Sequence, residues 1–315
     1  MIITDFLILN ESGLYCKTGN FYIDPIQPVA TAVISHAHGD HAVRGNYHVY
    51  CTASTCAIME LRYKKNAGNE FHIYAYHQNF IVNHVEITFI PAGHILGSAQ
   101  ILLVYNGVRY LYTGDYKLQD DATCEPIEFV EADVLITETT FADPEVLHPD
   151  PVNEIQKLNQ NRHNVLLGAY SLGKSQRIID LITRHCPERK VFVHHSIVPI
   201  NKVYEAFGFK PGNYELYNRK SMKLPEQNFV YLVPPMTFDS YFRAKNVIRV
   251  FASGWKRLQA QNDMTLLISD HVDWSDILKM IDRVKPKEIW TLHGDGTHLK
   301  AFFNGKIPLK LLNRC

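Results

Sequence analysis

The amino-acid sequence predicts an α/β protein of two domains, and three features of its patterning support this. Short strand-like runs dominate the N-terminal part. From about Pro144 onward, helix-like and strand-like segments alternate, which is typical of a parallel sheet covered by helices. A further strand-helix-strand-helix pattern occupies about 248–303. We therefore expect a larger domain formed by residues 1–147 and 251–315, interrupted by a small inserted α/β domain at 148–250.

The N-terminal part is expected to be rich in strands. They are predicted around residues 31–35, 47–51, 71–76, 86–90, 100–105, 108–113 and 133–138. Asn106-Gly107, between two apolar runs, is typical of a two-residue hairpin turn. The segment from Ala53 to Lys64 has apolar residues at helical spacing and is expected to form a helix.

The later elements follow from the same patterns. Helices are predicted at 151–161, 174–185 and 199–207, and strands at 164–169, 190–194 and 228–233. Cys186-Pro187 and Gly208 end two of the helices, in line with the tendency of proline and glycine to stop them. Two further strands are predicted at Thr265–Ile268 and Glu288–Thr291.

The segment Ser35-His36-Ala37-His38-Gly39-Asp40-His41 combines three imidazoles and a carboxylate directly after an apolar run. Residues two apart in an extended backbone point to the same side. His36 and His38 are therefore expected to bind one metal ion, while Asp40 and His41 turn toward a second. Imidazole nitrogen and carboxylate oxygen suit zinc, manganese or iron. The alternative, a histidine-rich surface loop without metal, does not explain the polar residues that follow later strands.

Those polar residues come at the ends of predicted strands. They are His94, Asp115, Glu138, His271 and His293. This succession of motifs resembles the metal-binding signature of the metallo-β-lactamase fold. Glu138 in Thr-Glu-Thr-Thr-Phe, His271 in Ser-Asp-His and His293 in His-Gly resemble the additional motifs of the β-CASP nucleases. The segments most similar to bacterial ligase-associated DNA exonucleases are Ala92–Gln100, Thr113–Lys117, Tyr170–Gln176, Ala252–Trp255 and Ser269–Trp274.

The resemblance implies an αββα metallo-β-lactamase sandwich with an inserted β-CASP domain, and it implies a set of site residues. One metal ion would be bound by His36, His38 and His94. The other would be bound by Asp40, His41 and His293, with Asp115 bridging the two. We expect two divalent ions, Zn²⁺ first and Mn²⁺ as the alternative.

Catalytic roles are implied for Asp40, Glu138 and His271. We expect His271 to donate a proton to the leaving oxygen, because an imidazole is the natural acid near neutral pH. Glu138 would orient His271 or a neighbouring group. For His271 the alternative is a packing or capping residue at a helix start.

Three further residues are candidates for binding phosphate. Ser171 and Lys174 lie between a predicted strand and a helix, where backbone N–H groups can bind an anion. Ser253 lies in a glycine-flanked turn that Trp255 follows. The alternatives are a plain helix N-cap for Ser171, a solvated charge for Lys174 and core packing for Trp255.

Composition is that of an ordinary globular protein, with 46% hydrophobic and 20% charged residues and zero formal net charge. Net charge therefore argues neither for nor against a nucleic-acid partner. The cysteines at 16, 51, 56, 124, 186 and 315 form no Cys-x-x-Cys pair, which predicts reduced thiols and a cytoplasmic protein. We expect no signal peptide and no membrane span.

By this resemblance we expect a dimetal-dependent nuclease, a DNA exonuclease of end processing or repair that acts in one pathway with a DNA ligase or helicase. The first alternative is an RNA-processing nuclease of the ribonuclease J or mRNA 3′-end type, since these share the same core residues. A thioesterase or lactonase would lack the insert and the Ser-Asp-His element. A non-catalytic binding subunit would have lost ligands, and none is missing here.

Overall fold

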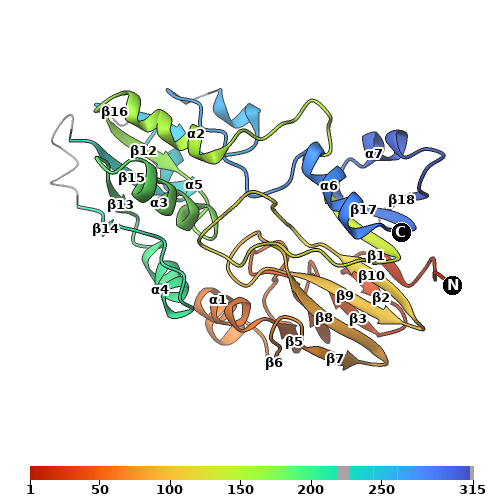
Figure 1. Ribbon diagram of the computed structural model, residues 1–315. Coiled ribbons are helices and arrows are strands. Elements are labelled where there is room, and N and C mark those ends of the chain that lie inside the picture. Colours follow the sequence, from red (N-terminus) through yellow and green to blue (C-terminus); the bar gives the residue numbers. More distant parts are fainter. Residues whose placement is uncertain (219–226, 244, 261, 313–315) are drawn as a thin grey trace. The chain divides into compact units, whose positions relative to one another are not determined.

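The computed structural model describes residues 1–218, 227–243, 245–260 and 262–312 (Figure 1). The chain forms two compact units. Unit 1 comprises Met1–Asp120, Cys124–Leu147 and His271–Cys315, and unit 2 comprises Asp121–Thr123 and His148–Asp270. Unit 1 is therefore built from both ends of the chain, and each unit is described by itself below.

Unit 1 contains a six-stranded sheet in the order β1-β2-β3-β4-β5-β6. The strands are β1 Leu7–Asn10, β2 Gly13–Cys16, β3 Phe21–Ile23, β4 Thr31–Val33, β5 His48–Cys51 and β6 Glu70–Ile73. The first three pair antiparallel, and β3 to β6 pair parallel. Helix α1 (Ala53–Tyr63) follows β5 and begins at Thr52, whose side chain accepts the Thr55 N–H, and η1 spans Lys64–Asn66.

The second sheet of unit 1 has seven strands in the order β18-β17-β11-β10-β9-β8-β7. They are β7 Asn79–Val82, β8 Val85–Pro91, β9 Ala99–Tyr105, β10 Val108–Tyr112, β11 Val134–Thr139, β17 Glu288–Gly294 and β18 Leu309–Leu311. The turn between β9 and β10 has positive φ at Asn106 (49°) and Gly107 (74°), which confirms the predicted hairpin.

Both faces of this second sheet are buried along its inner strands, and successive residues there alternate between two cores. Tyr110 and Tyr112 of β10 belong to the core shared with the first sheet, whereas Leu111 belongs to the core beneath the C-terminal helices. Those helices are α6 (Trp274–Val284) and α7 (Thr297–Phe302). Burial on both faces explains why these strands are nearly continuous apolar runs. The expected αββα metallo-β-lactamase sandwich is confirmed.

Unit 2 is built on an all-parallel, five-stranded sheet in the order β14-β13-β15-β12-β16. Its strands are β12 Asn164–Gly168, β13 Lys190–Val193, β14 Glu215–Leu216, β15 Phe229–Val233 and β16 Val247–Phe251. Its helices are α2 Pro151–Gln156, η2 Lys157–Gln160, α3 Lys174–His185, α4 Val198–Ala206, α5 Pro235–Ser240 and η4 Lys256–Gln259. Helices α2 and α3 cover one face of the sheet through Ile155, Ile178 and Ile182.

The boundary between the units differs from the expected one. We expected the chain to return to unit 1 at residue 251, but it returns at His271. The reason is that β16 pairs with β12 of the unit 2 sheet, and Leu266 and Ile268 are buried in the unit 2 core.

The predicted strand at Thr265–Ile268 is wrong, because this segment pairs with no strand of the described chain. Side chains bind its backbone instead. Gln259 Oε1 accepts the Leu266 N–H (3.1 Å), and Glu154 Oε2 accepts the Leu267 N–H (2.7 Å). Buried backbone groups are thus satisfied without a ladder.

Other elements differ in extent. The predicted helix at 151–161 is a shorter α-helix followed by a 3₁₀ turn. Strands that the patterns did not predict are β1, β2, β3, β7, β14 and β18. The described cysteines form no disulfide with one another and are buried, and Cys315 lies outside the described residues. Among the described helices, none is long and apolar enough to cross a membrane.

Candidate metal centre

The candidate site lies in unit 1, where loops follow the carboxyl ends of strands. His36, His38 and His41 lie in the loop after β4, and His94 follows β8. Asp115 follows β10. Strand β4 belongs to the first sheet and β8 and β10 to the second, so residues far apart in sequence converge where strands of two packed sheets end.

Four of the predicted ligands form one cluster: His36, His38, His94 and Asp115. The Nδ1 atom of His38 lies 3.0 Å from Nε2 of His36 and 3.0 Å from Nε2 of His94. Asp115 Oδ2 lies 3.6 Å and 3.9 Å from the same two Nε2 atoms. Converging ring nitrogens repel one another unless a proton or cation lies among them. Three imidazoles and a carboxylate are a donor set that zinc and manganese accept, so these residues fit a divalent metal ion.

Asp115 also connects this cluster to His41, whose Nε2 lies 3.3 Å from Asp115 Oδ2. The Asp40 carboxylate lies 4.0 Å from the same nitrogen, and its side chain is 81% exposed. The ring of His293 lies beside that of His41, with 5.1 Å between centroids. The structure thus brings all the predicted ligands together around Asp115, with Asp40 and His293 on the exposed side.

Two glycines make the close approach of these loops possible. Gly93, before His94, has φ 73°, and a Cβ there would lie 2.6 Å from the Lys117 carbonyl oxygen. Gly294, after His293, has φ 137°, and its Cβ would lie 2.2 Å from the Thr139 carbonyl oxygen. Both positions require glycine, which fixes where the two histidines leave the backbone.

Asp24 is a functional residue that the sequence reasoning missed. It is buried after β3, and its Oδ2 lies 2.9 Å from His41 Nδ1. Its carboxylate also accepts hydrogen bonds from the Ser35 N–H (2.7 Å), the Ser35 hydroxyl and the Tyr112 hydroxyl (3.0 Å). A carboxylate on one ring nitrogen of a ligating histidine orients the other nitrogen toward the metal. The available signal was an acidic residue directly after the short apolar run Phe21–Ile23.

Burial and neighbouring charges shift the pKa values of three groups in this site. Burial, together with the nearby His41 and His94, holds the pKa of His36 well below its usual range, so its imidazole is neutral. Burial opposes ionisation of Asp115, but His41 and His271 outweigh it and hold the pKa of Asp115 well below its usual range. Burial likewise disfavours the charged form of His41, yet Asp115 and Asp24 raise its pKa well above the usual value. The buried centre is therefore an ionised carboxylate among imidazoles.

Glu138 and His271 form a pair next to Asp115. His271 Nδ1 lies 2.9 Å from Glu138 Oε2, 3.2 Å from Oε1 and 3.9 Å from Asp115 Oδ2. Glu138 lies in β11, is buried, and accepts the Tyr116 N–H (3.2 Å). The His271 side chain is 29% exposed. A fixed carboxylate thus orients an imidazole that solvent can reach.

The three candidate phosphate-binding residues, Ser171, Lys174 and Ser253, lie in unit 2. Lys174 is buried, and its ammonium donates to the Ile268 carbonyl (2.7 Å) and pairs with Asp270 (3.1 Å). Lys174 is therefore not a solvated charge, and these partners argue against phosphate binding by its ammonium. Ser171 is not the N-cap of α3, which is Gly173. Ser253 is buried, and its hydroxyl accepts the Trp255 N–H (3.1 Å).

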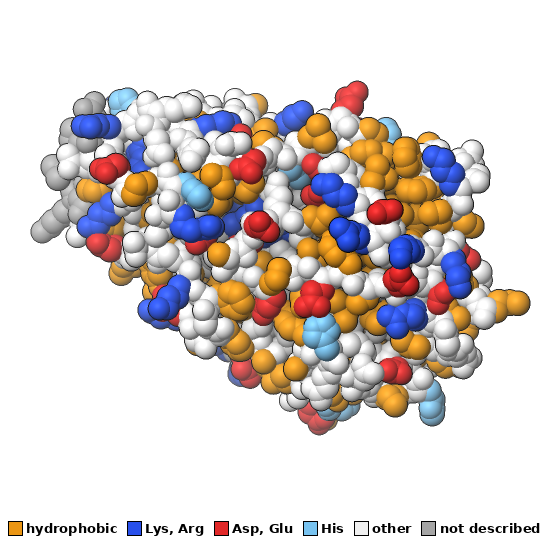
Figure 2. Space-filling model, in the orientation of Figure 1, with side chains coloured by type: hydrophobic (Ala, Val, Ile, Leu, Met, Phe, Trp, Pro, Cys, Tyr) orange, Lys and Arg blue, Asp and Glu red, His pale blue; other side chains and the backbone are white. Residues whose placement is uncertain are grey.

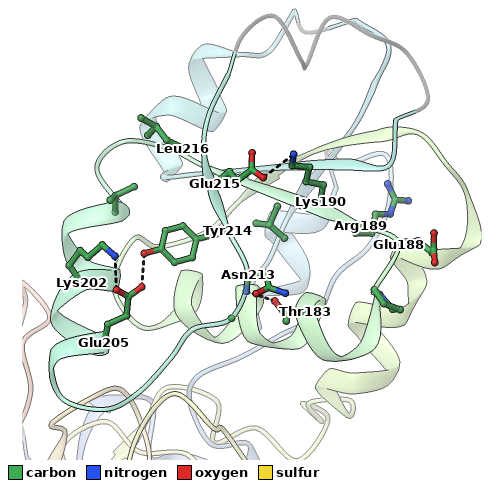
Figure 3. Close-up of a pocket in the computed structure, with 14 residues that line it drawn as sticks. Thr183, Glu188, Arg189, Lys190, Lys202, Glu205, Asn213, Tyr214, Glu215 and Leu216 are labelled. Carbon is green, nitrogen blue, oxygen red and sulfur yellow. Dashed lines mark hydrogen bonds and ion pairs between the residues drawn. The ribbon is translucent and has the colours of Figure 1, made fainter.

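Unit 2 also has a cavity of about 780 Å³ between β13, β14, α3 and α4 (Figure 3). Four of its six charged lining residues form ion pairs: Lys202 (2.6 Å) donates to Glu205, which also accepts from Tyr214 (2.8 Å), and Lys190 pairs with Glu215 (2.9 Å). None of its described lining residues is among the predicted site residues. Acidic and basic residues line this cavity in equal number, which does not favour an anion site.

The sequence was compared with known families and curated proteins. Residues 17–195 match the family described as "Beta-lactamase superfamily domain". A protein named "Probable DNA ligase" from Opitutus terrae is 30% identical over 301 residues, which cover 90% of this chain and 29% of that protein. An "RNase J-like protein" from Methanocaldococcus jannaschii is 25% identical over 233 residues, covering 64% of this chain and 55% of that protein.

An "Endoribonuclease YSH1" from Kluyveromyces lactis is 33% identical over 134 residues, covering 40% of this chain and 17% of that protein. The chain thus spans at most about half the length of these curated relatives. A crystal structure of an Enterococcus faecalis protein of unknown function superposes with a TM-score of 0.59 at 15% identity. It covers 90% of this chain and 79% of the other, which shows a shared fold.

The part of the chain that matches the family, residues 17–195, contains β4, the histidine loop after it, His94, Asp115 and Glu138. The metallo-β-lactamase fold implies divalent metal ions, and the histidine–aspartate cluster lies where such ions would be held. The chain therefore belongs to the β-lactamase superfamily, and it has the metallo-β-lactamase fold of the β-CASP nuclease group.

Proposed function

We propose that the chain is a dimetal-dependent nuclease that hydrolyses phosphodiester bonds. The observation that carries this proposal is the position of Asp115. Its Oδ2 lies 3.3–3.9 Å from nitrogens of His36, His41, His94 and His271, so one carboxylate oxygen joins two groups of ligands and a candidate acid.

In this proposal His36, His38 and His94 hold one divalent ion, and Asp40, His41 and His293 hold the other. Asp115 is shared by both. Nitrogen-rich coordination favours Zn²⁺, with Mn²⁺ as the alternative. When bound, two such ions lower the pKa of a bound water toward neutrality and neutralise phosphoryl oxygens. Asp40, whose side chain is 81% exposed, would also act in catalysis from the open side.

The chain's own residues supply the proton and its orientation. His271 is partly exposed and would donate a proton to the leaving oxygen of the substrate. Glu138 is a positioning residue, because its two oxygens contact His271 Nδ1 at 2.9 and 3.2 Å. Since the Tyr116 N–H holds Glu138 in turn, the imidazole is fixed before substrate arrives.

We infer a nucleic-acid substrate, with DNA favoured over RNA. The relative named as a probable DNA ligase aligns with 90% of the chain, whereas the RNase J-like relative aligns with 64% and the endoribonuclease with 40%. This favours a DNA exonuclease of end processing or repair, acting in one pathway with a DNA ligase or helicase. RNA processing is the second candidate, because two of these relatives are named as RNA nucleases.

Surface charge supplies no strong argument for either polymer. On the face shown in Figure 2, Lys and Arg side chains are interspersed with Asp and Glu. This agrees with the zero net charge of the chain. Attraction of a polyanion would therefore depend on the bound cations and on local contacts rather than on a broad basic field.

The test is a comparison of matched single-stranded DNA and RNA oligomers, labelled at either end, with Zn²⁺ or Mn²⁺ added to the protein. We expect faster degradation of DNA, and complete loss of activity in Asp115→Ala. Faster degradation of RNA would replace the DNA proposal with the RNA one. Hydrolysis of thioesters or lactones, with no cleavage of either polymer, would overturn the proposed function.

A further inference from the structure

A second group of metal-ligating side chains lies on the first sheet of unit 1, apart from the candidate centre. It consists of His48 on β5 and Glu70 and His72 on β6. The strands are parallel neighbours (Figure 1), with His48 opposite Glu70 and Tyr50 opposite His72. Residues 70 and 72 share one face of β6, so register alone places both side chains beside His48.

The ligand atoms are close enough to share one ion. His48 Nδ1 lies 3.1 Å from Glu70 Oε2 and 3.3 Å from His72 Nε2. The three atoms all lie within 4.8 Å of one another. The His48 and Glu70 side chains are 38% and 52% exposed. The group is therefore open to solvent, and an ion could enter without rearrangement of the sheet.

Aromatic rings restrict both imidazoles. The Tyr50 ring stacks on His72 with 4.4 Å between centroids and 13° between planes. Tyr47 meets His48 edge-on at 4.7 Å. Ordinary surface histidines sample several rotamers, and ordering them costs binding free energy. Here the ring contacts restrict the two imidazoles before an ion binds, which lowers that cost and favours ligand binding.

We propose that His48, Glu70 and His72 form an additional binding site for a divalent transition-metal ion, of which Zn²⁺ is the expected occupant. Two imidazoles and one carboxylate are a ligand set that zinc uses with open positions filled by water. Imidazole nitrogen disfavours Mg²⁺ and Ca²⁺, which prefer oxygen ligands.

This site is distinct from the candidate centre. Thr31 at the start of β4 pairs with His48 at the start of β5, whereas the histidine loop follows the end of β4. The two groups thus lie at opposite ends of parallel strands and share no residue. Occupancy of one does not require occupancy of the other, so the inference does not depend on the proposed nuclease activity.

A metal at this position would have a structural consequence. In the described sheet, β6 is one of the two edge strands, and β5 is its one neighbour. An ion bound by His48 from β5 and by Glu70 and His72 from β6 would tie the edge to the interior of the sheet. Because a ligand that binds only the folded state stabilises it, Zn²⁺ should raise the melting temperature through this site.

The test counts zinc ions. Three proteins are equilibrated at a series of buffered free Zn²⁺ concentrations: the wild type, His72→Ala and the control His163→Ala. The control removes an exposed histidine that lies outside both groups. Bound zinc is then measured by atomic emission. We expect His72→Ala to bind one ion fewer per chain than wild type and His163→Ala, and to lose part of the zinc-induced rise in Tm.

A second variant and a local readout keep the test decisive if His72→Ala misfolds. Glu70→Gln keeps the size of the side chain and should weaken binding of the same ion at least severalfold. In NMR spectra, the ring resonances of His48 and His72 should shift together as Zn²⁺ is added, while those of His163 stay in place. Equal zinc stoichiometry in wild type, His72→Ala and Glu70→Gln at every free concentration would overturn the proposal.

Discussion

Asp24→Asn should weaken metal binding at the candidate centre although Asp24 is not proposed as a ligand. The carboxylate accepts hydrogen bonds from Ser35 and Tyr112 and contacts His41 Nδ1 at 2.9 Å. An amide has one acceptor oxygen and one NH₂ donor in place of two acceptor oxygens. In the variant, either Ser35 or His41 loses its acceptor, and His41 loses the negative charge that fixes its orientation.

The size of the effect follows from the contact that is lost. A hydrogen bond to a charged group contributes about 1.5–3 kcal/mol, which corresponds to roughly 10- to 150-fold in a binding constant. Removal of such outer partners of ligating histidines typically costs about 10–100-fold in metal affinity or activity. Both estimates predict that the affinity for metal falls by between one and two orders of magnitude. This is a smaller loss of affinity than we expect when a ligand itself is removed.

The assay is competition for Zn²⁺ with a chromophoric chelator, run beside phosphodiesterase turnover. Tyr112→Phe is the matched control, since it removes one hydrogen bond to Asp24 (3.0 Å) but leaves the carboxylate and its contact with His41 in place. It should change affinity much less than Asp24→Asn. If Asp24→Asn folds, as judged by its melting curve, and binds zinc as tightly as wild type, the positioning role of Asp24 is refuted.

Three further outcomes are expected. His271→Ala should lower turnover by about 10²–10⁴-fold with unchanged metal content. The loss of turnover should be smaller on a nitrophenyl phosphodiester, whose leaving group needs no proton. Equal losses of turnover on both substrates would show that His271 is not the acid. Lys174→Met should lower the free energy of unfolding by about 1–3 kcal/mol in denaturant titrations, because the buried Asp270 carboxylate loses the Lys174 ammonium (3.1 Å) but keeps its ion pair with Arg177 (3.0 Å); an unchanged free energy of unfolding would refute a stabilising role of this pair. Burial raises the pKa of Cys16 to about 11. The fraction of reactive thiolate is therefore very small at pH 8 and grows only as the pH approaches this pKa. Iodoacetamide labelling at pH 8, followed by mass spectrometry, should modify Cys16 in denaturant but not in the folded protein.

Sequence patterns predicted the long elements of the fold better than the short ones. The inner strands of the second sheet in unit 1, β8 to β11 and β17, are mostly buried on both faces, so each is a largely apolar run that is easily recognised, whereas the edge strands β7 and β18 are not. Strands β1, β2 and β3 span only three or four residues each, too few for a period of two to stand out. The extended segment at Thr265–Ile268 has the composition of a strand, but side chains bind its backbone, and composition does not distinguish these cases.

The same contrast holds for the candidate site. The predicted ligands were recognisable because each lies in a conspicuous motif or directly after a predicted strand, and the structure brings them together around Asp115. Residue roles that depend on contacts across the fold were not recognisable. Lys174 has the sequence context of a phosphate-binding residue, yet it is buried against Asp270. Neither its burial nor its partner is encoded locally.

Asp24 shows why the supporting residues of such a site are harder to predict than its ligands. A ligand must carry a donor atom of a few types, so spacing and residue identity limit the candidates strongly. A supporting carboxylate needs only to reach one ring nitrogen, and many acidic residues could do so. What selects Asp24 is the pairing of β3 with β4, which places the end of β3 beside the start of the histidine loop. The chemistry of His41 is therefore set by strand register, which becomes visible only once the sheet is built.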